Sequence, residues 1–245
     1  TMSTDQMIAM VAVVIVLAVV QSLFGVGLLL FGTPIFLLLG LPFEQVLGYL
    51  LPCSIVVSGL QVATSGGLTL EPIRRQFLMI TAPAVLVATG VAVALGTPHQ
   101  IRLIVGVVLL VTAISRVGRL QPVLRRTVGK HSRPLMLVLG IVHGWSNLGG
   151  GILTVIVGAS FEDKVSIRRQ IAFAYGSMAI IQLSVVMATV RPHLALGLWL
   201  LLPVIAGIVF LLIGQRAFQK ARQRPYQLGL TGLILSFGAL LVATA

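Results

Sequence analysis

The stretch His143–Gly151, which reads HGWSNLGGG, decides how this chain folds. It lies inside the apolar segment Pro134–Ser160, where an uninterrupted membrane helix would carry mainly leucine and valine. Counting Gly140, five glycines fall within twelve residues. Each glycine in a helix interior costs about 1 kcal/mol relative to alanine. The glycine triplet therefore predicts that the helix is broken here.

Two interpretations of this glycine-rich stretch are open at the level of sequence. A broken backbone is tolerated at membrane depth where it is buried in protein or lines a wet cavity. Small residues also let two helices approach closely, so the same glycines are compatible with an unbroken, close-packed helix crossing. The polar residues His143, Ser146 and Asn147 beside the glycines favour the break.

The composition predicts an all-α polytopic membrane protein. Of 245 residues, 58% are hydrophobic and 9% are charged, whereas a soluble domain carries about 25% charged residues. The mean hydropathy is +1.09. The run Met7–Val20 is not expected to be a signal peptide, because no lysine or arginine precedes it. The single cysteine, Cys53, rules out an intramolecular disulfide and a cysteine-based metal cluster.

About eight hydrophobic segments follow one another, and their order indicates an internal repeat. Gly32 matches Gly150 at a shift of 118 residues, and Gln61 matches Gln182 at a shift of 121. We predict two halves, 1–120 and 134–245, joined by a basic linker at 121–133. Each half is expected to hold one glycine-broken unit and three transmembrane helices of about 20 residues. In the first half the interruption is expected at Phe24–Gly27.

The distribution of charge predicts the topology. If every unit crosses the membrane, the 17 lysines and arginines divide eight against nine between the two sides. If both broken units are re-entrant hairpins, they divide 15 against two. Positive residues concentrate on the cytoplasmic side, so the hairpin model is favoured, with the basic loops cytoplasmic. An odd number of crossings in each half then makes the halves an inverted repeat.

The net charge of +12 is attributed to this topology and to contact with the lipid bilayer, so nucleic acid is not expected as a partner. In the hairpin model, the ends of half-helices and free backbone N–H groups point to the bilayer centre, where they attract a small anion. We expect the two hairpins to meet there and to bring Thr33 near Gly150 and Gly151.

The candidate substrate-binding residues come from the broken units and from neighbouring spans. They are Gly32, Thr33, Pro34, His143, Ser146, Asn147, Gly149, Gly150 and Gly151 from the units, and Gln61, Tyr175 and Gln182 from the spans. The hydroxyls of Thr33 and Ser146 have an alternative role, which is to bond their own helix. The alternative role for Gln61, Tyr175 and Gln182 is contact between helices.

Other chemistry finds little support in the chain. No Gly-x-Ser-x-Gly or His-Glu-x-x-His motif is present, and the four histidines lack the spacing of metal ligands, so neither an enzyme nor a metal site is expected. A small anion bound at the bilayer centre favours a permease as the function. A membrane-embedded enzyme and a non-transporting assembly component are the two alternatives. None of the five acidic residues lies within a span, which leaves His143 as the candidate proton carrier. Gradient-driven transport, with a neutral structural His143, and a sodium site built from unwound carbonyls are equally open.

The glycine-rich beginnings of the two halves resemble the TauE/SafE sulfite exporter family. They are Phe24–Gly27 followed by Gly32-Thr33-Pro34, and His143-Gly144 followed by Asn147–Gly151. The first unit departs from the pattern, because Leu28–Phe31 fills the space where a glycine pair or triplet usually precedes the proline. The resemblance covers most of the chain. It implies a permease for sulfite or an organosulfonate, without a cofactor, in a bacterial inner membrane, and it is compatible with a homo-oligomer.

Overall fold

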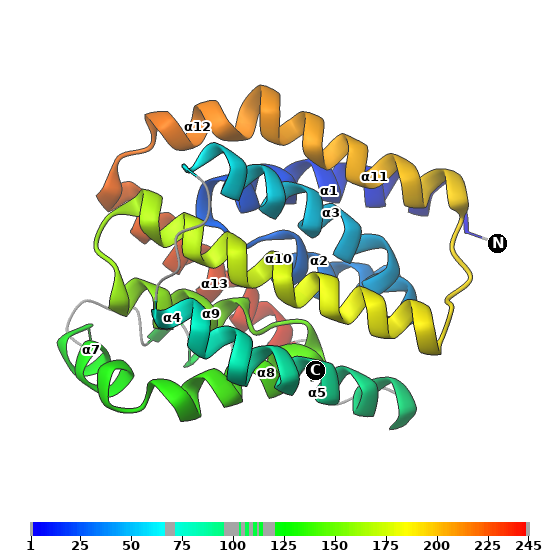
Figure 1. The fold of residues 1–245 in the computed structure, drawn as a ribbon. Coiled ribbons are helices and arrows are strands. Elements are labelled where there is room, and N and C mark those ends of the chain that lie inside the picture. The colour runs from blue at the N-terminus through cyan, green and yellow to red at the C-terminus, as the bar shows by residue number, and fades with distance from the viewer. Residues whose placement is uncertain are drawn as a thin grey trace.

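The computed structural model describes residues 2–66, 72–95 and 121–243, together with positions 103, 106, 107, 110, 111, 113 and 114. Every regular element in this part of the chain is a helix, which confirms the all-α class. The first half contains α1 (Thr4–Phe24), α2 (Leu28–Leu38), α3 (Phe43–Thr64), α4 (Pro72–Gln76), the π-helical turn η1 (Phe77–Thr81) and α5 (Ala82–Leu95). The remainder contains α7 (Gln121–Lys130), α8 (Ser132–Ser146), α9 (Gly150–Ser160), α10 (Lys164–Thr189), α11 (Leu196–Val209), the π-helical turn η2 (Phe210–Gly214), α12 (Gln215–Lys220) and α13 (Gln223–Ala243) (Figure 1).

Five helical stretches in the described residues are long and apolar enough to cross a membrane. They are Thr4–Phe24, Phe43–Thr64, Ile73–Leu95, Lys164–Thr189 and Leu196–Lys220. The multi-pass membrane class predicted from composition is thereby confirmed. The predicted span at 101–115 lies largely outside the described residues, and the predicted linker at 121–133 is mostly helical, since it contains α7.

Both predicted helix interruptions are present. α1 ends at Gly25, which has a left-handed φ of 79°, and α8 ends at Asn147, which has a φ of 64°. At Gly27 an added Cβ would lie 2.9 Å from the carbonyl oxygen of Leu17, and at Gly149 it would lie 2.5 Å from Cβ of His143. The chain therefore turns back on itself at both places, where only glycine fits.

The two breaks correspond at an offset of 122 residues rather than the 118 inferred from Gly32 and Gly150. Gly25 matches Asn147 at this offset. Gly32, Thr33 and Pro34 lie inside α2 instead of at the break, whereas Gly150 is the first residue of α9. Glycine spacing alone misplaced the match, because Gly32 lies seven residues after the break at Gly25, whereas Gly150 lies three residues after the break at Asn147.

Each broken unit returns to the end of the bundle from which it started. Gln6 in the first turn of α1 donates a 3.0 Å hydrogen bond to the carbonyl of Leu39, which follows α2. Ser132 at the start of α8 and Ser160 at the end of α9 line one surface hollow. The two units begin at opposite ends of the bundle, as the positions of the N-terminus and α7 show (Figure 1).

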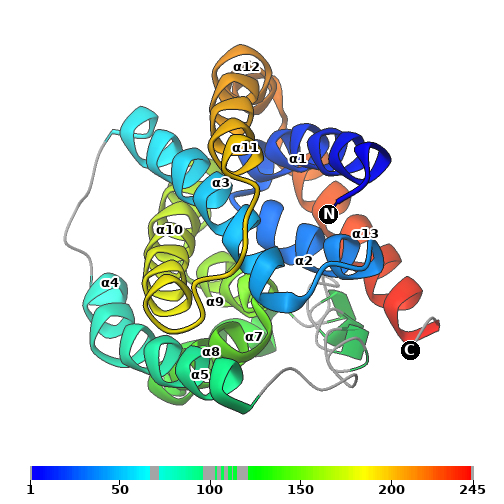
Figure 2. The same cartoon turned by 90° about the vertical axis from the view of Figure 1, so that its right-hand side faces the viewer.

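The long helices α3 and α10 form the centre of the bundle and run antiparallel. Arg168 near the start of α10 donates to the hydroxyl of Ser65, which follows α3, at 3.1 Å. At the other end, the N–H of Ala195 donates to the hydroxyl of Tyr49 in α3 at 2.8 Å. Helices α11 and α12 lie on one side of this pair, and α4, α5 and α8 lie on the other (Figure 2).

Basic residues from separate loops gather at one end of the bundle. Lys164 donates to the carbonyls of Phe218 and Ala221 at 3.0 and 2.7 Å. Arg75 and Arg133 line one hollow. This arrangement brings together loops that the charge count assigned to one side, and we call it the basic end.

The arrangement of loops predicts a specific labelling pattern. In a Cys53→Ser background, single cysteines at the exposed positions Thr127 and Val165 should be accessible from the same side of the membrane, and one at His193 from the opposite side. A membrane-impermeant thiol reagent should modify Thr127→Cys and Val165→Cys only after cells are permeabilised. Reaction of only one of these two in intact cells would mean that the second unit crosses the membrane.

Candidate functional site

The second break is joined to the first unit by a buried amide. Asn147, at the end of α8, donates from Nδ2 to Oγ1 of Thr33 in α2 at 2.9 Å. Both side chains are fully buried. The sequence led us to expect Thr33 beside Gly150 and Gly151. The structure places it against Asn147 instead, three residues before Gly150.

The backbone carbonyls exposed by this break are taken up by side chains from other helices. The carbonyl of His143 accepts the N–H of Asn147 at 2.7 Å and Nε2 of Gln182 at 3.0 Å. The carbonyl of Gly144 accepts the hydroxyl of Thr89 at 3.2 Å. An unsatisfied backbone group costs several kcal/mol in a membrane interior, so these contacts make the break tolerable.

Tyr175 in α10 covers the start of α9. Its ring centroid lies 5.7 Å from that of His143 at an interplanar angle of 59°. A Cβ added to Gly150 would lie 2.9 Å from Cε2 of Tyr175, so the absence of a side chain at Gly150 lets the aromatic ring approach the backbone. We call the cluster of Thr33, His143, Asn147, Gly150, Tyr175 and Gln182 the break site.

The break site contains several polar atoms without partners. Both ring nitrogens of His143, Oδ1 of Asn147, the hydroxyl of Tyr175 and Oε1 of Gln182 are buried and make no well-formed hydrogen bond within the described part of the chain, although the Gln182 amide lies near the His143 ring and the Leu30 backbone lies near the Tyr175 hydroxyl. Buried polar groups are nearly always paired with protein or with ordered water. These five atoms make the beginning of α9 the candidate position for ordered water or a polar ligand.

Gln61 belongs to the first break and not to the break site. Its Nε2 donates to the carbonyl of Gln21 at 2.7 Å. Gly25 at this break packs against Ile171 of α10, whereas the second break is capped by Gln182 of the same helix. Eleven residues of α10 separate these two contacts, which corresponds to about 16 Å. The two breaks therefore do not form a single site.

The remaining predicted residues have structural contacts. Ser146 donates to the carbonyl of Val142 in its own helix at 2.7 Å, which was its alternative role. Gly32 and Pro34 are buried inside α2, and the carbonyl of Gly151 accepts the hydroxyl of Thr154 at 2.7 Å. Gly149 allows the close return of the chain onto His143.

Both interpretations of the glycine-rich stretch hold, for different glycines. Gly140 and Gly144 pack α8 against α5, where an added Cβ would lie 2.6 Å from Cβ of Ala84 and 2.7 Å from Cβ of Ala88, respectively. These two are therefore glycines of a close helix crossing. Gly149 and Gly150 lie at the break itself.

Sequence reasoning missed a buried arginine, because Arg168 was counted as a loop charge. It is 1% exposed, its guanidinium lies 3.5 Å from the ring centroid of Phe218, and it donates to the carbonyl of Ser22 at the first break at 3.2 Å. The signal was present in the spacing, since Arg168 shares a helix face with Ile171 and Tyr175 at intervals of three and seven residues.

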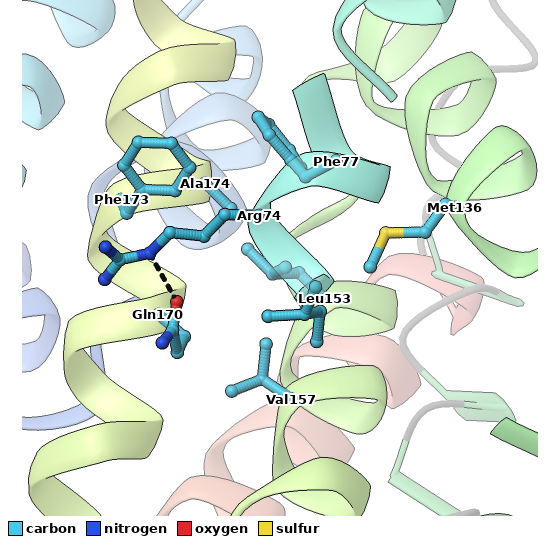
Figure 3. Close-up of a pocket in the computed structure, with 9 residues that line it drawn as sticks. Arg74, Phe77, Met136, Leu153, Val157, Gln170, Phe173 and Ala174 are labelled. Atoms are coloured by element: carbon cyan, nitrogen blue, oxygen red, sulfur yellow. Dashed lines mark hydrogen bonds between the residues drawn. The ribbon is translucent and has the colours of Figure 1, made fainter. Parts of the chain in front are cut away.

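A second buried arginine lines a small cavity at the basic end (Figure 3). Arg74 donates from Nε to Oε1 of Gln170 at 2.8 Å, and its guanidinium carbon lies 4.9 Å from the centroid of the Phe173 ring. Nε2 of Gln170 is buried without a partner among the described residues. The cavity measures about 10 Å³, roughly the room of one water molecule.

This cavity lies on the face of α9 that leads to the break site. Leu153 and Val157 of α9 line it, and Gly150 is three residues, or about 4.5 Å of helix, beyond Leu153. Ala174 of α10 also lines it and is adjacent in sequence to Tyr175. The cavity and the break site are therefore neighbours along the same two helices.

The apolar helical bundle defines a multi-pass membrane protein. The chain belongs to the TauE/SafE sulfite exporter family, whose model matches residues 10–241. This is a family of membrane transporters of sulfur anions and not of enzymes, which confirms the class predicted from the sequence. Comparison with curated proteins and with solved structures gives no match.

The close approach at Gly150 predicts a localised sensitivity to added volume. Gly150→Ala should lower the free energy of unfolding by about 1–3 kcal/mol, because the new methyl group must displace the Tyr175 ring. Gly158→Ala in the same helix is the matched control, since nothing lies within 4 Å of the added Cβ there. The measurement is thermal or denaturant unfolding of both variants in detergent. Equal stability of the two variants would contradict the proposed packing of Tyr175 on Gly150.

Proposed function

We propose that this protein transports a small sulfur oxyanion, such as sulfite or an organosulfonate, and binds it at the break site. The observation that carries this proposal is the set of five buried, unpartnered polar atoms around the beginning of α9. The Tyr175 hydroxyl and one His143 nitrogen can donate to the oxygens of such an anion, whereas Oδ1 of Asn147, Oε1 of Gln182 and the second ring nitrogen accept and suit a protonated oxygen such as that of hydrogen sulfite. The fully buried position of Asn147 and Tyr175 would separate that ligand from bulk water.

The site offers neutral donors to an anion. The beginning of α9 contributes free backbone N–H groups and the positive end of the helix dipole. The Tyr175 hydroxyl can donate, and so can one nitrogen of the neutral His143 imidazole. Asn147 can also donate if its amide rotates by 180°. The Thr33 hydroxyl would then donate to Oδ1 of Asn147, and the NH₂ group would be available to the anion. No formal charge is needed for recognition.

We also propose that the two halves are an inverted repeat with the basic end in the cytoplasm. Three features support this arrangement: α3 and α10 are antiparallel, the two broken units start from opposite ends, and each unit returns to its own end. The concentration of lysine and arginine at one end then follows the positive-inside tendency. We place the protein in a bacterial inner membrane on the same basis.

The cavity beside Arg74 supports an approach to the break site from the basic end. The guanidinium would attract an anion to this entrance, and α9 and α10 then lead to Gly150 and Tyr175. A sulfite ion is larger than one water molecule, so the entrance has to widen. The π-helical turn η1 begins three residues after Arg74, and such turns are frequent at functional sites.

Asn147 provides the direct test of the binding site. Asn147→Gly removes the amide but keeps a residue that adopts the left-handed backbone of this position. We expect sulfite binding to weaken by about 1–3 kcal/mol, the range for a lost buried hydrogen-bonding partner. The measurements are sulfite binding to purified protein and flux of labelled sulfite into proteoliposomes.

Ser146→Ala is the matched control for this experiment, because the Ser146 hydroxyl bonds its own helix. Its binding should stay close to that of the wild type. Unchanged binding in Asn147→Gly, with normal flux, would move the site away from the second break. Absence of sulfite and sulfonate flux in the wild type would contradict the transport proposal itself. A proton gradient imposed in the same assay tests whether His143 couples transport to protons.

The entrance generates a separate prediction. Arg74→Gln should raise the KM for sulfite about tenfold and make transport less dependent on ionic strength, because the variant removes a buried positive charge near the entrance. Arg75→Gln removes the same charge from the adjacent, exposed position and should change KM much less. Equal effects of the two variants would indicate a general surface potential instead of a specific entrance at Arg74.

A further inference from the structure

The two breaks share one backbone design. At an offset of 122, Gln21 corresponds to His143 and Gly25 to Asn147. The N–H of Gly25 bonds the carbonyl of Gln21 at 2.8 Å, and the N–H of Asn147 bonds the carbonyl of His143 at 2.7 Å. The following long helix supplies a glutamine to each of these carbonyls, Gln61 at 2.7 Å and Gln182 at 3.0 Å.

The side chains at the two corresponding positions behave differently. At the first break, Oε1 of Gln21 accepts the backbone N–H of Leu28, the first residue of α2, at 3.1 Å. Nε2 of Gln21 donates to the hydroxyls of Ser54 and Ser58, each at 3.2 Å. At the second break, neither ring nitrogen of His143 has a partner among the described residues.

The helices packed against the two breaks also differ in the hydrogen-bonding groups that they offer. At an offset of 121, Tyr175 and Ala179 of α10 correspond to Ser54 and Ser58 of α3. The two serines complete the hydrogen bonds of the Gln21 amide. The Tyr175 hydroxyl lies near the Leu30 backbone but makes no well-formed hydrogen bond among the described residues, and Ala179 has no polar group. The Gln21 amide at the first break is thus paired within the fold, whereas the His143 ring at the second break is not. Oε1 of the glutamine from the following helix, Gln61 or Gln182, lacks a partner among the described residues at both breaks.

We propose that the Gln21 carboxamide is a built-in substitute for the substrate, and that each chain therefore binds one anion, at the second break alone. The amide oxygen of Gln21 occupies the position at the start of α2 that a substrate oxygen takes at the start of α9. This inference rests on the proposed function, since it assigns the transported sulfur anion to one of two related positions. The first break then has a structural role only, because the Gln21 side chain occupies the position that an anion would take there.

The first test converts the second break into a copy of the first. The variant carries His143→Gln together with Tyr175→Ser and Ala179→Ser, so that the new amide meets residue 150 and two hydroxyls as Gln21 does. We expect sulfite binding to weaken by more than about tenfold while the melting temperature stays level or rises. The control is His143→Ala in the same Tyr175→Ser and Ala179→Ser background, which lacks the amide. It should have a lower melting temperature than the variant with glutamine.

The reciprocal test empties the first break. Gln21→Ala removes the partner of the Leu28 N–H and should lower the melting temperature. At constant ionic strength, sulfite should restore stability more in this variant than in the wild type, and titration should approach two anions per chain. The double variant Ser54→Ala and Ser58→Ala is the control, because Gln21 still reaches Leu28. It should lose stability without additional protection by sulfite.

The outcomes separate this inference from the proposed function. Wild-type affinity for sulfite in the His143→Gln triple variant would overturn the inference, and so would identical protection of Gln21→Ala and wild type by sulfite. If Gln21→Ala yields no folded protein, the His143→Gln arm decides. Sulfite flux in the wild type would support the proposed function in every one of these cases. A wild type with neither flux nor binding would contradict the proposed function, and with it the inference that rests on it.

Discussion

The two hydrogen bonds from Gln61 to the Gln21 carbonyl and from Gln182 to the His143 carbonyl support the rest of this structure. A helix that ends inside a membrane leaves carbonyls that neither lipid nor water can satisfy. Each of the central helices α3 and α10 supplies a glutamine for the broken unit that precedes it. The antiparallel packing of α3 against α10 then brings both breaks into one bundle. Polar groups at each break that the helix no longer pairs can form hydrogen bonds with other partners.

The two halves share this backbone arrangement but differ in how the side chains at the break are paired. At the first break Ser54, Ser58 and the Leu28 N–H pair the Gln21 amide, while Oε1 of Gln61 has no partner among the described residues. The second break keeps five polar atoms that make no well-formed hydrogen bond among the described residues, and one of them belongs to Asn147, which bonds Thr33. A repeat relaxes the requirement that both copies do the same thing, because one copy can hold the scaffold while the other contacts the solute.

The sequence predicted the break at HGWSNLGGG, the return of each unit and the gathering of basic loops, because glycine content and charge report on backbone and topology directly. It did not predict the role of Gln21, since one amide within an apolar run forms no local pattern. Gln61 and Gln182 were assigned to one site because they match in the repeat. The two units start from opposite ends of the bundle, and these two glutamines lie at different breaks, which only the three-dimensional arrangement reveals. Arg168 was misjudged because its burial depends on Phe218, fifty residues away.

In the proposed function, the placement of charge would distinguish the entrance from the binding site. Arg74 and the basic loops lie at one end, and the break site offers neutral donors and acceptors together with a helix dipole. A full positive charge in a buried site would hold a sulfur dianion strongly and slow its release, whereas transport requires binding strong enough to enter and weak enough to leave. Attraction at the basic end and neutral recognition inside, as we propose them, would meet both requirements. Under this proposal the anion would move along its own electrochemical gradient, and a proton carried by His143 would add a second driving force.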